Sequence, residues 1–175
     1  MENIENNVAA NYFLKEYFYK NFDSTNGVNN SIEVIFSPKC NLQCSYCYLH
    51  KYYQETFPTD MFNVEKSLAN MEIVLEWMKK NNFNCPIEIF SGELFSQSSG
   101  YELLEVIYNF LVKNPSFKPR YVTVPSNFTF ICDDILTKKV KSLLDRYMDI
   151  GVPLLLSASV DGKYMEDNRK IFKKY

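Results

Sequence analysis

Short apolar runs and helix-like stretches alternate along most of this chain, and this alternation is the strongest constraint on its fold. Runs rich in β-branched and aromatic residues predict four strands, at residues 32–36, 87–90, 121–124 and 152–158. Apolar residues repeat at helical spacing in the three stretches between them, at residues 64–80, 101–113 and 133–150. Alternating strands and helices predict an α/β fold with a parallel sheet. Right-handed crossovers then permit either an open, doubly wound sheet or a barrel.

The ends of the third predicted helix carry clear local signals. Asp133 and Asp134 are residues of the type that caps helix N-termini, and Gly151 is of the type that ends helices in a left-handed conformation. The sequence therefore predicts that this helix begins at the aspartates and ends at the glycine.

The first 30 residues do not follow the alternation. Aromatic residues recur at helical spacing between Tyr12 and Phe22, and the run from Asp23 to Gly27 predicts a break. We therefore expect residues 1–30 to form a helical appendage to a domain that spans residues 31–175.

Charge and cysteine content narrow the class of protein. The 175 residues carry 19 basic and 21 acidic side chains, and a net charge of −2 argues against a general nucleic-acid binder. No apolar run approaches the ~20 residues that span a bilayer, and the N-terminus lacks the pattern of a secretory signal. We expect a cytoplasmic protein without a membrane partner. In that compartment, five cysteines indicate metal or cluster binding rather than disulfides.

Residues with thiol, hydroxyl, amide or carboxylate side chains follow the ends of all four predicted strands. In chain order, these segments are Cys40–Cys47, Ser91–Glu93, Ser126–Asn127 and Ser159–Gly162. Because the carboxyl ends of parallel strands meet at one edge of a sheet, we expect the four segments to converge there.

Three thiols fall within eight residues of the first segment, at Cys40, Cys44 and Cys47. Thiolates are ligands of iron–sulfur clusters and of zinc. A 4Fe–4S cluster held by three protein thiolates leaves one iron open to an external ligand, whereas a zinc ribbon needs two Cys-x-x-Cys pairs. The cluster is therefore the preferred interpretation. The alternative is a zinc site completed by His50, Cys85 or Cys132.

The remaining candidate ligands have simpler interpretations. Cys85 precedes the second predicted strand, and Cys132 lies beyond the Ser126–Asn127 segment. We expect both to be buried, small apolar residues rather than ligands. His50 is the only histidine and is interpreted as a local hydrogen-bonding residue, so no histidine acid–base mechanism is proposed.

The pattern Cys-x-x-x-Cys-x-x-Cys, with an aromatic residue directly before the third cysteine, resembles the signature of the radical S-adenosylmethionine (radical SAM) enzymes. The resemblance implies that Cys40, Cys44 and Cys47 bind a 4Fe–4S cluster, whose open iron is chelated by the amino and carboxylate groups of S-adenosylmethionine. Reductive cleavage of this cofactor yields a 5′-deoxyadenosyl radical that abstracts hydrogen from the substrate. By the same resemblance, Tyr46 lies near the adenine.

Two further segments resemble cofactor-binding motifs of this family. Ser91, Gly92 and Glu93 resemble its Gly-Gly-Glu segment, which implies that the Glu93 carboxylate pairs with the ammonium group of the cofactor. Ser126 and Asn127 resemble the Thr-Asn-Gly segment on the ribose side, although Phe128 stands in place of the glycine.

The last segment points to a branch of the family. Ser159-Val160-Asp161-Gly162, followed by Asp167-Asn168-Arg169, resembles a stretch of the peptide- and protein-modifying enzymes, which include the sulfatase-maturating enzymes. The resemblance implies cofactor contacts for Ser159 and Asp161. Asp161 and Arg169 have an equally good interpretation as a structural ion pair.

The family fold is a partial (β/α)6 barrel, and this sequence predicts only four strands. The resemblance therefore implies an incomplete barrel, which is a fragment of a longer product, a minimal variant or one half of an oligomer. The predicted function is radical chemistry on a peptide or protein substrate, with an external electron donor. The alternatives are a zinc-binding α/β interaction module and an inactive remnant that still binds the cluster.

Overall fold

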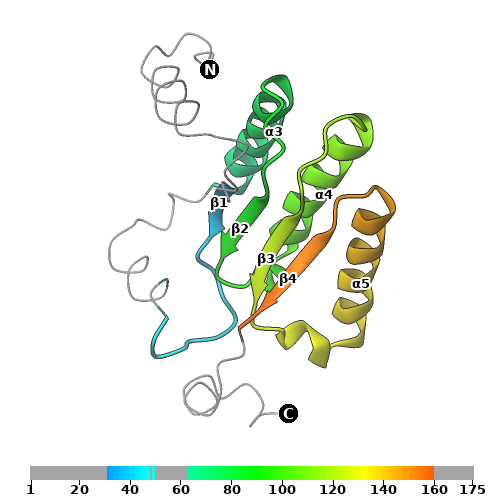
Figure 1. The fold of residues 1–175 in the computed structure, drawn as a ribbon. Helices are drawn as coiled ribbons and strands as arrows, with labels where there is room; N and C mark the ends of the chain where they lie inside the picture. The colour runs from blue at the N-terminus through cyan, green and yellow to red at the C-terminus, as the bar shows by residue number, and fades with distance from the viewer. Residues whose placement is uncertain (1–30, 48, 50–62, 160–175) are drawn as a thin grey trace, which may run out of the picture. The chain divides into compact units, whose positions relative to one another are not determined.

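The fold is known from a computed structural model that describes residues 31–47, 49 and 63–159 (Figure 1). Within these residues, the chain forms four strands, β1 (Ile32–Ser37), β2 (Ile87–Ser91), β3 (Val122–Ser126) and β4 (Leu154–Ala158). All neighbouring strands pair in parallel, in the order β1-β2-β3-β4. The prediction of an α/β fold with a parallel sheet is confirmed, whereas the predicted appendage at residues 1–30 lies outside the described residues.

Three helices connect the strands: α3 (Val64–Lys80), α4 (Ser98–Lys113) and α5 (Asp134–Asp149). Two short 3-10 helices, η4 (Leu94–Ser96) and η5 (Thr129–Cys132), follow β2 and β3. None of the described helices has the length and apolar character that crossing a membrane would require.

The strand order bears on one of the two architectures that the sequence left open, the doubly wound sheet. Successive strands add to the sheet in one direction, so right-handed crossovers place all three helices on the same face, as Figure 1 shows. A doubly wound sheet reverses its strand order and carries helices on both faces. The described strands contain no such reversal, and they form an open sheet with β1 and β4 at its edges.

Local capping interactions fix the ends of the helices. The Asn63 side chain accepts a hydrogen bond from Lys66 N at the start of α3, over 2.9 Å. At α5, Asp133 rather than Asp134 is the capping residue, because its carboxylate accepts bonds from the first turn. Gly151 follows the helix with φ +74°, which confirms the predicted glycine end.

The core lies between the sheet and the three helices. Ile87, Ile89, Val122 and Val124 alternate along the two central strands and point toward the helices, where each is fully buried. The helices contribute Leu75, Leu103, Leu104 and Tyr147 to the core, all fully buried. Each such side chain contributes about 1.5–3 kcal/mol through removal of its apolar surface from water.

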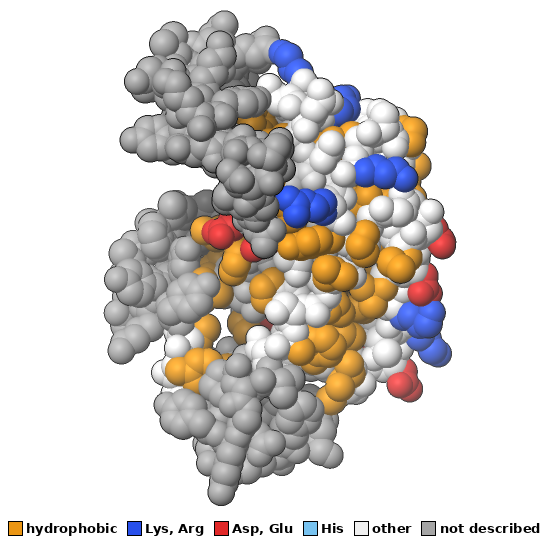
Figure 2. All heavy atoms as spheres, viewed as in Figure 1, with side chains coloured by type: hydrophobic (Ala, Val, Ile, Leu, Met, Phe, Trp, Pro, Cys, Tyr) orange, Lys and Arg blue, Asp and Glu red, His pale blue; other side chains and the backbone are white. Residues whose placement is uncertain are grey.

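The opposite face of the sheet has a mixed composition. Its side chains come from alternate positions, so that Glu33 of β1, Glu88 of β2, Thr123 of β3 and Leu155 of β4 stand in one row. Ile35 and Leu155 remain 56% and 45% exposed there. Figure 2 shows that hydrophobic side chains gather on the viewed face, over the sheet. Apolar residues therefore line both faces of the sheet, but the described helices cover only one.

Candidate functional site

The segments that follow the first three strands are bonded together at the carboxyl edge of the sheet, as expected from the parallel topology. Gly92 N donates to Ser37 O over 2.8 Å, and Glu93 N donates to Lys39 O over 2.9 Å. Ser159 N, directly after β4, donates to Ser126 O over 3.1 Å. Backbone hydrogen bonds thus continue beyond the strands and join the loops that follow them. We call these loops, at the carboxyl edge of the sheet, the rim.

Gly92 permits the close approach of two of these loops. A Cβ atom at this position would lie 2.3 Å from Lys39 O and 2.5 Å from Pro38 O. Both contacts are with backbone atoms, which cannot swing aside as a side chain can. The glycine in the Ser-Gly-Glu segment is therefore required by the loop that follows β1, and it fixes the path by which that loop enters the cysteine segment.

Ser91 and Gln97 fasten the same loop from the side of β2. The buried Ser91 Oγ donates to Ser37 O over 2.9 Å. Gln97 Nε2 donates to Lys39 O over 2.8 Å and to Glu93 O over 3.0 Å. These contacts give Ser91 a structural role, and its cofactor contact stays a prediction. Gln97 was missed by the sequence analysis, because an isolated glutamine between two helices carries no pattern.

Glu93 is buried at the rim, with only 1% of its surface exposed. Its carboxylate accepts hydrogen bonds from Asn127 N over 2.6 Å, from Phe95 N over 3.2 Å and from Ser126 Oγ over 3.1 Å. Donors from the ends of β2 and β3 therefore compensate the buried negative charge. Burial raises the pKa of the neighbouring Tyr101 to about 12, and the charge of Glu93 adds to the increase.

Asn127 connects β3 to the cysteine loop through its side chain. Its Nδ2 donates to Asn41 Oδ1 over 3.0 Å and lies 3.8 Å from Cys40 Sγ. Asn41 Nδ2 in turn donates to Thr129 Oγ1 over 2.7 Å. Asn41 and Thr129 were not predicted as site residues. The only sequence signal for Asn41 was its position directly after the first cysteine.

The three clustered cysteines are free thiols on the loop after β1, with Cys40 exposed and the other two half-buried. The protein around the Cys40 sulfur partly excludes water and raises its pKa, an effect opposed by the N–H of Leu42. The negative charges of Glu93, Cys44 and Cys47 raise this pKa further. The charge of Glu93, on the loop after β2, therefore acts on the first cysteine of the loop after β1.

The donor set of this loop bears on which metal centre it could hold. Among residues 31–47, 49 and 63–159, no three cysteine, histidine, aspartate or glutamate side chains are gathered around one ion position. In a 4Fe–4S cluster each thiolate binds a different iron, whereas the ligands of a zinc site share one ion. Three free thiols on one loop are therefore suited to three irons of a cluster, whereas a structural zinc site needs four converging ligands.

The cysteines outside the loop differ from each other. Cys85 is 3% exposed beyond the amino end of β2, and burial raises its pKa to about 11, as expected of a packing residue. For Cys132 the prediction was wrong, because this residue is exposed at the end of η5. Cys132 is the last residue of the short 3-10 helix η5, where its side chain is exposed. A segment of four residues is too short for a pattern of apolar residues to indicate which side chains are buried. His50 lies outside the described residues.

Cys132 also lines a hollow of about 260 Å³ at the rim, together with Asn41, Glu93, Thr129 and Asp133. The edge-to-face pair of Phe95 and Phe130, with ring centroids 5.3 Å apart, forms its apolar part. A second, apolar hollow of about 180 Å³ lies near the end of α4 and the start of β4, at the opposite end of the sheet. The hollow at the rim is thus the one that adjoins the predicted site residues.

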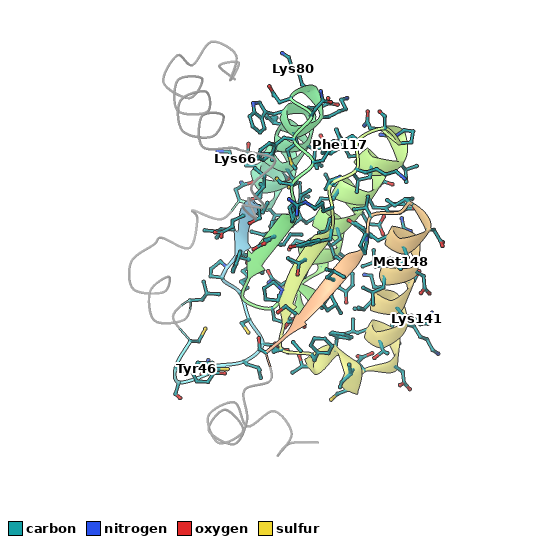
Figure 3. The ribbon with its side chains drawn as sticks, viewed as in Figure 1. Tyr46, Lys66, Lys80, Phe117, Lys141 and Met148 are labelled. Atoms are coloured by element: carbon teal, nitrogen blue, oxygen red, sulfur yellow. The ribbon has the colours of Figure 1, made fainter. Side chains whose placement is uncertain are left out.

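The remaining predicted residues lie at or beyond the limits of the described chain. Tyr46 is 36% exposed and projects from the loop after β1 (Figure 3). Ser159 is joined to β3 through its backbone, as described above. Asp161 and Arg169 lie outside the described residues, so their cofactor contact or ion pair stays a prediction.

Comparisons with known proteins add no family assignment. No protein-family model, no curated protein and no solved structure matched this chain with significant similarity.

Proposed function

We propose that this chain is a radical SAM enzyme, or part of one, which holds a 4Fe–4S cluster on Cys40, Cys44 and Cys47. The observation that carries the proposal is the placement of these three free thiols. They stand on the loop after the first strand of a parallel sheet, and hydrogen bonds tie that loop to the ends of β2 and β3. The spacing of the thiols and the position of the loop both resemble the radical SAM pattern.

The protein residues would bind and orient the two cofactors. Three thiolates would bind three irons and leave the fourth open to S-adenosylmethionine. The bound cluster would supply one electron to cleave the cofactor to a 5′-deoxyadenosyl radical. Glu93, which lines the rim hollow beside Asn41, would pair with the ammonium group, because a buried carboxylate next to a hollow attracts a cation. Ser126 and Asn127 would hold Glu93 in place through the bonds described above.

The strand order supports a barrel-type domain as the setting for this chemistry. A sheet that grows in one direction, with helices on one face, is the arrangement from which (β/α) barrels are built. In an incomplete barrel, the face with Ile35 and Leu155 would line the interior, and the mixed side chains there would meet a peptide or protein substrate. The electron would come from an external donor.

One observation favours a second candidate, a zinc-binding interaction module. Cys132 is exposed and lines the same hollow as Asn41, the neighbour of Cys40, so a fourth thiol is present at the rim. Movement of the cysteine loop toward it would complete a four-thiolate zinc site. The inactive remnant is the third candidate, because it would share the cysteine loop and differ only in reactivity.

The metal content separates the first two candidates. The chain is reconstituted anaerobically with iron and sulfide, and iron, sulfide and zinc are measured. We expect about four irons and four sulfides per chain. Cys47→Ala should lose them, whereas Cys85→Ala and Cys132→Ala should retain them. Zinc without iron, with loss of zinc in Cys132→Ala, would instead establish the interaction module.

The reaction separates an enzyme from a remnant. After chemical reduction in the presence of S-adenosylmethionine, the enzyme releases 5′-deoxyadenosine, which is measured by chromatography. A chain that holds the cluster but releases none of this product, before and after addition of candidate peptides, would be the remnant.

A further inference from the structure

A closed ring of hydrogen bonds joins three side chains at the rim: Asn41, Asn127 and Thr129. Asn127 Nδ2 donates to Asn41 Oδ1, Asn41 Nδ2 donates to Thr129 Oγ1, and Thr129 Oγ1 donates to Asn127 Oδ1, over 3.0, 2.7 and 2.8 Å. Every donor in the ring faces an acceptor, and the three directions are mutually consistent. Such a ring joins the residue after Cys40 to two residues that follow β3.

The backbone fixes the orientation of the Asn127 amide within the ring. Its Oδ1 also accepts a hydrogen bond from Thr129 N over 3.0 Å. A backbone N–H can only donate, so the oxygen of the amide must face Thr129 and the NH₂ group must face the cysteine loop. The backbone N–H of Asn127 is meanwhile held by Glu93 Oε2 over 2.6 Å. The backbone N–H and the side-chain amide of Asn127 are therefore each held by hydrogen bonds within the protein.

This orientation directs an N–H group at the sulfur of Cys40. Asn127 Nδ2 is 3.8 Å from Cys40 Sγ, and Leu42 N also donates to that sulfur, over 3.4 Å. As a thiol, Cys40 can donate to Asn41 Oδ1, at 3.9 Å. A thiolate bound to iron has no proton to donate, and only the two N–H donors can then interact with it. Two N–H donors therefore remain to face the sulfur when it is a thiolate.

We infer that Asn127 is a positioning residue for Cys40, which holds the thiolate through an N–H···S hydrogen bond and thereby raises the reduction potential of the cluster. The inference rests on the proposed function, because it concerns a ligand of the proposed cluster. A hydrogen bond to a ligand sulfur withdraws negative charge from it and so favours the reduced, more negative cluster. The side chain of Asn127 thus acts on the cluster, in contrast to the ribose-side contact that the family resemblance implies.

The test is the midpoint potential of the reconstituted cluster, measured by a redox titration without S-adenosylmethionine. Asn127→Asp removes the donor, places a negative charge beside Cys40 and leaves the backbone bond to Glu93 available. We expect a more negative midpoint potential. Thr129→Val removes one bond that orients the amide and should shift the potential in the same direction by less. Thr129→Ser keeps the hydroxyl group and is the matched control, with the wild-type potential.

The absence of S-adenosylmethionine makes the two roles of Asn127 distinguishable. A residue that only contacts the ribose would change cofactor affinity and leave this potential unchanged, and that result would overturn the inference. Should Asn127→Asp fail to hold iron, Asn127→Ala decides the question, because it removes the N–H donor without adding a charge and a wild-type potential there also overturns the inference. A wild-type chain that binds no iron would refute the proposed function itself, whereas a bound cluster with unshifted potentials refutes only the role of Asn127.

Discussion

The two ends of the sheet hold a cysteine in opposite ways. Cys85, beyond the amino end of β2, is 3% exposed and belongs to the apolar core. Cys40, after the carboxyl end of β1, is exposed, and N–H groups of Leu42 and Asn127 face its sulfur. The same side chain is a small apolar residue at one end and a candidate ligand at the other.

The apolar core and the rim are also held together by different kinds of interaction. The helix-covered face of the sheet is held by side chains such as Ile89 and Leu104, which need only be apolar and of the right size. The rim is held by directional contacts of Gly92, Glu93 and Asn127, each of which has a specific partner. Apolar packing therefore accounts for most of the stability, and hydrogen bonding determines where the reactive side chains stand.

The largest expected effect is a loss of stability without a change at the rim. Leu104→Ala, at a fully buried position of α4, should lower the free energy of unfolding by about 2–5 kcal/mol, because it leaves a cavity. Iron binding by the folded protein should not change. Chemical denaturation and iron analysis measure the two quantities. Val112→Ala, on the exposed side of the same helix, is the control and should stay within about 0.5 kcal/mol.

The second effect compares two glycines, one at each end of the sheet. Gly92→Ala should cost about 3 kcal/mol, because the new Cβ would meet backbone atoms of the cysteine loop. Gly151→Ala should cost about 1–2 kcal/mol, from the left-handed φ of +74° alone. Only Gly92→Ala displaces the loop, so only this variant should change the rate at which Cys40 is alkylated. Equal alkylation rates in both variants would contradict the role assigned to Gly92.

A smaller loss of stability is expected from a substitution of the buried Glu93. Glu93→Gln retains the shape of the side chain but presents one oxygen where two accepted bonds, so either Phe95 N or Asn127 N loses its acceptor. An unsatisfied buried N–H costs about 1–3 kcal/mol, measured by chemical denaturation. Glu88→Gln, on the uncovered face of the sheet, is the control and should have little effect. A loss no larger than in the control would show that Glu93 does not brace β2 against β3.

The spacing of apolar residues predicted the helices and strands of the core well. Each of these elements repeats its apolar residues at a spacing that can be recognised within the element itself. The structure has α3 at Val64–Lys80, the range predicted. The start of α4 was placed three residues late, at Tyr101 instead of Ser98. Gly100, directly before the predicted range, lies within the helix, where a Cβ would be 2.2 Å from Leu94 O. Close packing on η4 explains this glycine, and a local pattern does not contain that information.

The rim was predicted in outline and missed in detail. Parallel topology was enough to bring the ends of the first three strands together. The partners of the individual side chains depend on loops that are distant in sequence, such as Asn41 and Thr129, which are 88 residues apart. The sequence could not choose between a doubly wound sheet and a barrel for the same reason, because strand order is a property of tertiary pairing. Cysteine spacing could be recognised, whereas the hydrogen bonds around each sulfur could not.

The smallest expected effect concerns the pH dependence of stability at the amino end of the sheet. Burial raises the pKa of Cys85 in the folded protein to about 11, above its ordinary value of 9.0. The folded state therefore keeps a proton that the unfolded state loses between these values, and stability falls as pH rises from about 9 to about 11. Below pH 9 both states are protonated and the contribution is complete. Cys85→Ala should remove this part of the pH dependence, as measured by denaturation at pH 8 and pH 10.5. Cys132→Ala is the control, because it removes an exposed thiol without opening a cavity in the core. If the two variants gave the same pH dependence, burial of Cys85 would make no difference to stability that sets it apart from the exposed cysteines.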